Sequence, residues 1–366
     1  MNSIYSASKT NFKLRPDLAH MRSRKNIKSI LYSIRELLYG FGISFVKPSL
    51  ESKRRKFFDP LYITIINVVI MSKDFSSMIV NNDTFSIIVG DYAYKWKLKN
   101  QFNLLMVLTF ILPVGTHLFH FLYYRKKKFD YWLTLSSDDH PLGTVVTLDR
   151  ISQFVLNMFE VITHVMFPMG FFLLCFSSLA MSCTLKELVL SGIPWSIVYA
   201  FYGLYDPGMY LFQMLYFVVL SYDCKLEFKQ LNRNLESFTR TQTKNTWNFE
   251  PNLKIFIKTL DRNRRDFTKI NDFWSKYLFF NWIAMSSVLS GFLLQILFGK
   301  LGITINCMFG SIFMIGVIYL SVLIYSATTL YNETNKTFKI VNQLFIRSID
   351  SNINIKTKLK VNQNLL

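Results

Sequence analysis

Two pairs of ionisable side chains lie within otherwise apolar stretches of the sequence, His117 with His120 and Glu160 with His164. Residues three or four apart share one face of a helix, so Glu160 and His164 are placed to pair. Ionisable groups inside a membrane are costly, and they commonly serve a proton relay or a polar contact to a ligand. A plainer interpretation is that these side chains hydrogen-bond neighbouring helices or lie near the membrane surface. The sequence leaves both interpretations open.

No motif in the sequence points to an enzyme. It contains no glycine-rich phosphate loop, no nucleophile elbow and no zinc motif. The spacing of the four cysteines, Cys175, Cys183, Cys224 and Cys307, matches neither a zinc site nor a disulfide framework. A bridge between Cys183 and Cys307 is one alternative, but free thiols are favoured. We therefore predict no enzymatic activity, no metal and no cofactor.

A further group of side chains suits a pocket for a small organic ligand. Such pockets combine an apolar, aromatic lining with a few polar groups that orient the ligand. The candidate lining consists of Phe167, Phe171, Gln213, Phe292, Gln295, Asn306 and Phe309. Helix packing and lipid contact are the alternative interpretation of the same aromatic stripes. The sequon Asn82-Asp83-Thr84 adds a candidate site for N-glycosylation.

The composition indicates that membrane helices must position these side chains. The chain of 366 residues is 51% hydrophobic and 16% aromatic, and several of its apolar runs are long enough to cross a bilayer. Its net charge of +19 is compatible with binding to nucleic acid. In a membrane protein, however, lysine and arginine gather on the cytoplasmic side and near anionic lipid headgroups. We therefore expect contact with membrane lipids and no nucleic acid.

We predict an all-α membrane protein with six membrane-spanning helices. Lys73 and Asp74 interrupt the first span, and the third is longer than a bilayer requires. Residues 184–207 are apolar enough for a seventh span, but Gly192, Pro194 and the Asp206-Pro207 pair interrupt them. The sequence therefore predicts that 184–207 is an extracellular apolar loop folded against the helices. The six predicted spans lie near 57–80, 101–124, 151–183, 208–224, 272–298 and 303–331.

The distribution of basic residues predicts the orientation. With six spans and a cytoplasmic N-terminus, 35 of the 42 Lys and Arg residues fall in cytoplasmic segments and 5 in outer loops. With seven spans and an outer N-terminus, the split becomes 21 inside and 19 outside. Only the first arrangement obeys the positive-inside rule. We therefore expect both the N-terminus and the C-terminus to be cytoplasmic.

The cytoplasmic side is predicted to be substantial. Residues 1–56 form a basic segment with an amphipathic helix that suits the membrane interface or the surface of a cytosolic domain. The six-helix transmembrane domain, 57–331, includes a cytosolic helical loop at 225–271. Apolar residues at helical spacing within 253–270 lead directly into the fifth span, and similar residues follow the sixth. Residues 332–366 are expected to form a cytoplasmic C-terminal helix and a basic tail.

Two stretches of the chain resemble the arthropod gustatory and odorant receptors. The first runs from Tyr210-Leu211-Phe212-Gln213 through Ser221-Tyr222 to Phe228, Leu231, Asn232 and Leu235. The second runs from Val341 to Phe345 and on to Ile355-Lys356-Thr357-Lys358-Leu359-Lys360. The order of short and long loops and the cytoplasmic N-terminus extend this resemblance over almost the whole chain. The gustatory branch is the closer of the two.

The resemblance implies a chemosensory receptor of the plasma membrane that acts as a ligand-gated cation channel. It implies a homo- or hetero-tetramer of related subunits, each with a pocket for a small organic tastant or odorant in its outer half. Members of that family have a seventh, pore-lining helix that carries an aromatic residue followed by Gln-Phe. Here the last residues, Val361-Asn362-Gln363-Asn364-Leu365-Leu366, differ from that helix. We therefore expect that the sequence is truncated before the seventh helix.

Two other functions compete with this one. A proton-coupled secondary transporter would use Glu160 and His164 to carry the proton. A G-protein-coupled receptor would need seven spans and an outer N-terminus, which the distribution of basic residues disfavours. The sequence does not identify the ligand, because the shape of a pocket depends on how the helices pack.

Overall fold

The computed structural model describes residues 34, 53–80, 82–125, 157–158, 160–180, 183–241 and 249–349. Every regular element in this part of the chain is helical, which confirms the predicted all-α class. The elements in chain order are α2 (Lys53–Ile79), α3 (Asp83–Ile88), α4 (Lys99–Arg125), η2 (Ile162–Met166), α7 (Phe167–Ala180), α8 (Leu185–Glu187), η3 (Leu188–Gly192), α9 (Ile193–Thr241), α10 (Phe249–Phe298) and α11 (Ile303–Ile349).

Five of these helical stretches are long and apolar enough to cross a membrane, which is the pattern of a multi-pass membrane protein. Helix α2 occupies the place of the predicted first span but is not one of the five. The total of six crossings and the orientation of the chain remain predictions. The five stretches are Lys99–Phe119, Ile162–Ala180, Leu185–Ser237, Asn263–Phe298 and Ile303–Gln343.

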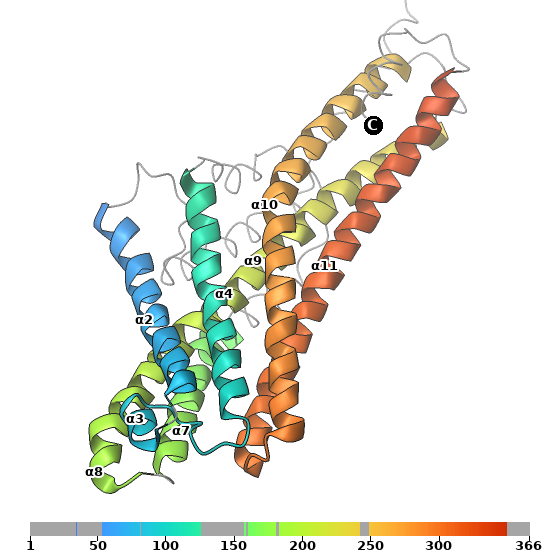
Figure 1. The fold of residues 1–366 in the computed structure, drawn as a ribbon. Coiled ribbons are helices and arrows are strands. Elements are labelled where there is room, and N and C mark those ends of the chain that lie inside the picture. The colour runs from blue at the N-terminus through green and yellow to red at the C-terminus, as the bar shows by residue number, and fades with distance from the viewer. Residues whose placement is uncertain are drawn as a thin grey trace, which may run out of the picture.

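Helices α9, α10 and α11 are much longer than a membrane is thick. They contain 49, 50 and 47 residues, which corresponds to roughly 70–75 Å of helix. The hydrocarbon core of a bilayer is only about 30 Å thick. All three continue beyond α2 and α4 at one end of the bundle, whereas α3, α8 and the turn between α10 and α11 lie at the opposite end (Figure 1).

Side-chain contacts join α9 to α11 where these two helices continue beyond the bundle. The side-chain amide of Asn232 on α9 donates to the backbone oxygen of Glu333 on α11 at 3.1 Å and to its carboxylate at 3.3 Å. Lys336 on α11 forms an ion pair with Glu236 on α9 at 2.9 Å. Apolar residues on both helices in this region are also buried, namely Leu231, Leu235, Leu330 and Val341. The prolongations of α9 and α11 therefore form a packed helix pair.

The predicted loop at 184–207 is wrong, because the structure continues as helix from Leu185 through α8, η3 and α9. The wider π-helical turn of η3 precedes Pro194, which lies in the first turn of α9, where its missing N–H is tolerated. The segment packs against α7, and Gly203 on α9 lies so close that an added Cβ would be 2.8 Å from the backbone oxygen of Phe167. This packing outweighs the local helix-breaking tendency. The segment and the predicted fourth span thus form one helical stretch.

The predicted helical stripes are confirmed. Helix α10 runs unbroken from the stripe at 253–270 into the fifth span, and α11 continues past the sixth span to Ile349. The predicted third span is described only at 157–158 and 160–180, with the π-helical turn η2 inside it. The predicted interfacial helix in 1–56 lies outside the described residues, apart from Ile34, which is helical and fully buried, and the first residues of α2.

Candidate functional site

A buried polar cluster joins the C-terminal half of α2, the segment after α3 and the beginning of α9. These parts lie at the end of the bundle opposite the prolongations of α9, α10 and α11 (Figure 1). The first members of the cluster are Lys73 and Asp74, the two residues that interrupt the apolar run of α2. Their side chains are only 4% and 2% exposed, and their charged groups form an ion pair at 2.8 Å. Charged groups this deeply buried are tolerated only when they are paired and hydrogen-bonded.

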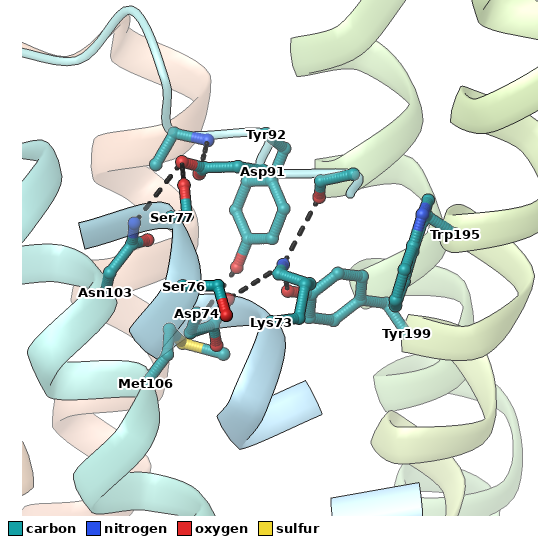
Figure 2. Close-up of polar contacts among 12 residues, drawn as sticks. Lys73, Asp74, Ser76, Ser77, Asp91, Tyr92, Asn103, Met106, Trp195 and Tyr199 are labelled. Carbon is teal, nitrogen blue, oxygen red and sulfur yellow. Dashed lines mark hydrogen bonds and ion pairs between the residues drawn. The ribbon is translucent and has the colours of Figure 1, made fainter. Parts of the chain in front are cut away.

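The ammonium group of Lys73 has three hydrogen-bond acceptors. It donates to the Asp74 carboxylate, to the backbone oxygen of Gly90 at 3.3 Å and to the hydroxyl of Tyr199. A lysine ammonium carries three donors and no acceptor, so these contacts satisfy it completely. The acceptors come from α2, from the segment after α3 and from α9, and Lys73 thereby joins three separate elements (Figure 2).

Three aromatic rings surround the same ammonium group. Its nitrogen lies 4.8 Å from the ring centroid of Tyr199, 5.5 Å from that of Trp195 and 5.9 Å from that of Tyr92. Tyr199 meets the ammonium group through its hydroxyl, so the attraction of a cation to the quadrupole of a ring face within about 6 Å comes from Trp195 and Tyr92. Asp74, the Gly90 carbonyl, Tyr92, Trp195 and Tyr199 are hereafter called the lysine cage (Figure 2).

A second carboxylate, Asp91, holds the wall of the cage that carries Gly90 and Tyr92. It accepts hydrogen bonds from the backbone nitrogen of Ala93 at 3.1 Å, from the hydroxyl of Ser77 and from the amide of Asn103 at 3.3 Å. The ammonium nitrogen of Lys99, in the first turn of α4, forms an ion pair with the Asp91 carboxylate at 3.4 Å. Asp91 therefore ties the segment between α3 and α4 to both α2 and α4.

Burial controls the charge state of Tyr92, the aromatic residue that this segment contributes to the cage. Removal from water, with a smaller contribution from the carboxylate of Asp74, raises the pKa of the Tyr92 phenol well above its usual value. The phenol is therefore neutral at physiological pH, and its ring presents an uncharged π face to the ammonium group. Tyr92 also meets Tyr199 edge to face, with the ring centroids 5.0 Å apart.

Gly90 is required at its position for two reasons. Its φ of +68° belongs to the left-handed region that side chains disfavour. An added Cβ would lie 2.1 Å from Cγ and 2.6 Å from Cβ of Trp195. Trp195 is itself anchored, because its indole nitrogen donates to the backbone oxygen of Ile88 at 3.1 Å. Only glycine allows the Trp195 indole to lie this close to the segment that carries Gly90 and Tyr92.

We expect the substitution Gly90→Ala to destabilise the protein. The left-handed backbone costs a non-glycine residue about 1–3 kcal/mol, and the clash with the root of the Trp195 side chain adds to that cost. The measurement is the melting temperature of the detergent-solubilised protein. Gly302→Ala is the matched control, because nothing lies within 4 Å of an added Cβ there. Equal melting temperatures for the two variants would contradict the close approach of Trp195.

Four of the residues predicted from sequence to line a pocket meet near the same end of the bundle. The rings of Phe292 and Phe309 lie 5.2 Å apart, and Phe309 also stacks on Phe102 at 5.7 Å. Gln295 is buried and donates to the backbone oxygen of Leu98 at 3.3 Å. Asn306 donates to the backbone oxygen of Leu301 at 3.2 Å. This group connects α4, α10 and α11.

The other predicted pocket residues lie elsewhere in the bundle. Phe171 on α7 meets Tyr202 on α9 edge to face at 5.2 Å, and Phe167 lies one turn before it against the same helix. Gln213 is buried on α9, three turns beyond Tyr202. The predicted lining is thus divided between two helix contacts and a third position on α9, and its contact with a ligand remains a prediction.

The predicted ionisable pairs have different surroundings. Glu160 and His164 are both exposed, and Nδ1 of His164 lies 2.9 Å from the backbone oxygen of Glu160. His117 is buried on α4, whereas the side chain of His120 lies outside the described residues. In the described part of the chain, the four cysteines form no disulfide and no group of His, Cys, Asp or Glu side chains is placed to hold a metal ion.

The members of the lysine cage were missed by sequence reasoning. One signal was present, because adjacent charged residues such as Lys73 and Asp74 within an apolar run mark a functional or paired position. Nothing in the sequence connects them to Tyr199, which lies 126 positions further along the chain. We compared the chain with protein-family models, with curated proteins and with solved structures, and none of the three comparisons found a match.

Proposed function

We propose that this protein is a chemosensory, gustatory-like receptor of the plasma membrane and a subunit of a ligand-gated cation channel. The observation that carries the proposal is that α9, α10 and α11 all continue far beyond a membrane's thickness at one end of the bundle. A long cytosolic helical bundle beneath a small-molecule site is the architecture expected from the resemblance to arthropod gustatory and odorant receptors.

The charges on the prolonged helices support this orientation. Basic residues lie along the prolongation of each helix, for example Lys229 on α9, Arg265 on α10 and Lys339 on α11, and these three are exposed. Basic residues flanking membrane helices face the cytoplasm. The prolongations are then cytosolic, and the end that contains the lysine cage faces outward.

The outer end supplies groups that suit a small organic ligand. It contains the lysine cage and, beside it, the aromatic group around Phe309. Tyr92 connects them, because its ring lies 5.6 Å from Phe102, which stacks on Phe309. A ligand that binds the open state more tightly than the closed state shifts the equilibrium between them. The packed pair of α9 and α11 would carry that change to the cytosolic side.

Electrophysiology tests the proposal. We expect ligand-evoked cation current when the protein is expressed with a related receptor subunit, and less or none from that related subunit alone. Candidate tastants and odorants are the probes. Uptake of solute driven by a pH gradient and abolished by Glu160→Gln would contradict the proposal and favour the proton-coupled transporter. Surface labelling of an N-terminal tag on intact cells would instead favour a G-protein-coupled receptor.

N-glycosylation is expected at Asn82. Asn82 and Thr84 are both exposed, and the Asn82 side-chain oxygen caps α3 by accepting from the backbone nitrogen of Phe85 at 3.1 Å. The amide nitrogen, which carries the glycan, is not needed for that cap. Treatment with an N-glycosidase should increase the mobility of the protein on a gel, and Asn82→Gln should abolish the change.

The sequons at Asn332 and Asn335 provide the matched control. Both lie on the prolongation of α11, where we place the cytosol, and their threonines Thr334 and Thr337 are buried. Substituting glutamine for either asparagine should leave the glycosidase-dependent change intact. A change that persists in Asn82→Gln and disappears in Asn332→Gln or Asn335→Gln would reverse the proposed orientation.

A further inference from the structure

We propose that the lysine cage is a binding site for an alkylammonium group and that Lys73 is its tethered occupant. The ligands of the proposed receptor would then include organic amines, whose ammonium group replaces that of Lys73. This inference rests on the proposed function for its biological meaning. The existence of the site is nevertheless tested on the purified protein alone.

The composition of the cage is that of a cation site. Two aromatic rings, one hydroxyl and one carboxylate surround a single ammonium nitrogen, with the Asp74 oxygen at 2.8 Å and the ring centroids of Trp195 and Tyr92 at 5.5 and 5.9 Å. Aromatic rings arranged in this way recognise organic ammonium ligands in proteins. The hydroxyl of Tyr199 and the carbonyl of Gly90 accept the remaining N–H groups, which selects a primary amine.

The walls of the cage are held in place without Lys73. Asp91 fixes the segment that carries Gly90 and Tyr92 through its contacts with Ala93, Asn103 and Lys99. The bond from its indole nitrogen to Ile88 fixes Trp195. Lys73, by contrast, reaches its position through a flexible four-carbon stem. Removal of that stem would leave the rings and the carboxylate in position around a space of the same shape.

The charge balance favours a replacement cation. Asp74 has Lys73 as its cation, whereas the neighbouring carboxylate, Asp91, has its own partner in Lys99 at 3.4 Å. Without the Lys73 ammonium, the cage would contain a buried carboxylate with no counter-charge, which is strongly unfavourable. A small amine of the right length relieves that imbalance, whereas a neutral molecule of equal size does not.

Chemical rescue tests the site. The variant Lys73→Ala removes a propyl chain and an ammonium group, so n-propylammonium is the matching probe and 1-propanol the neutral control. We expect propylammonium to raise the melting temperature of purified Lys73→Ala, and the rise to grow with the logarithm of its concentration. Propanol should give no such rise, and wild-type protein should respond to propylammonium more weakly, because Lys73 competes for the site.

Two further variants establish where the amine binds. Lys73→Ala combined with Asp74→Asn keeps the space but removes the negative charge, and it should lose the response to propylammonium. Lys73→Ala combined with Trp195→Leu removes one ring and should shift the response to higher concentration. An equal response to propanol, or an equal response in the Asp74→Asn double variant, would overturn the proposal.

A second substitution covers the case in which Lys73→Ala cannot be purified. Lys73→Met retains most of the apolar stem and opens only the ammonium position, for which the ammonium ion, added as ammonium chloride, is the probe and sodium chloride the control. Stabilisation of Lys73→Met by ammonium chloride and not by sodium chloride supports the site, and its absence overturns it. Failure of rescue would leave the channel proposal standing. Stabilisation by the amine without any amine-evoked current would support the binding site and count against the channel proposal.

Discussion

The substitution Lys73→Met is expected to lower the stability of the protein by about 3–5 kcal/mol. Methionine fills much of the volume of the lysine stem, so the main change is the loss of the ammonium group. Asp74, whose side chain is 2% exposed, then remains buried without its cation. The same change removes the hydrogen bonds to Gly90 and Tyr199 that join α2 to the segment after α3 and to the beginning of α9. The measurement is the melting temperature of the detergent-solubilised protein.

The double variant Lys73→Met with Asp74→Leu separates the charge from the packing. Replacing a buried ion pair by apolar residues of similar volume is often neutral or stabilising. The double variant should therefore recover most of the lost stability. Lys97→Met, at an exposed position between α3 and α4, is the surface control and should resemble the wild type. A Lys73→Met protein as stable as the Lys97→Met protein would contradict the buried ion pair.

The substitution Gly203→Leu is expected to separate α7 from α9. An added Cβ at position 203 would lie 2.8 Å from the backbone oxygen of Phe167 and 2.7 Å from Cδ2 of Phe171. Because a backbone oxygen cannot rotate away, the helices must move apart. Overpacking commonly lowers the free energy of unfolding by about 1–3 kcal/mol. We expect Gly203→Leu to reach or exceed the upper end of that range, because the leucine would press against backbone atoms. Lower expression and a lower melting temperature are the expected results.

Gly310→Leu on α11 is the matched control for Gly203→Leu. Both positions are helical, and nothing lies within 4 Å of an added Cβ at position 310. The two substitutions carry the same change in helix propensity, so the difference between them reports the helix contact alone. Gly310→Leu should be close to the wild type in melting temperature. Equal losses in the two variants would show that α7 and α9 are not in close contact at Gly203.

The helices with a strong local signal could be predicted from the sequence. The spacing of apolar residues predicted α10 from its stripe at 253–270 into the fifth span, and also the continuation of α11 past the sixth. In both cases periodicity, length and the absence of proline from 253–298 and from 303–349 agree. For these two helices, the local sequence is therefore enough to predict the structure.

The segment 184–207 could not be predicted in the same way. Gly192, Pro194 and Pro207 are local signals for a break, and nothing nearby in the sequence opposes them. The structure resolves the conflict by a π-helical turn at 188–192 and by the close packing of α9 on α7 around Gly203. That contact joins residues far apart in the chain, so local reasoning does not reveal it.

The candidate site, too, could be predicted only in part from the sequence. Phe292 and Phe309 were predicted together and are in contact, because the short turn between α10 and α11 brings them to one end of the bundle. The lysine cage combines residues from α2, from the segment after α3 and from α9. Lys73 signals an unusual position by its charge, but its aromatic partners are ordinary residues of an aromatic-rich chain.

The central claim is that the cage end faces the outside and the prolonged helices face the cytosol. Labelling of introduced cysteines with a membrane-impermeant maleimide tests it most directly, in a background in which the exposed Cys307 and the partly exposed Cys183 are replaced by serine. Lys97→Cys marks the cage end and Lys339→Cys the prolongation of α11, and both positions are exposed. We predict labelling of Lys97→Cys in intact cells and of Lys339→Cys only after permeabilisation. The reverse pattern would contradict the account.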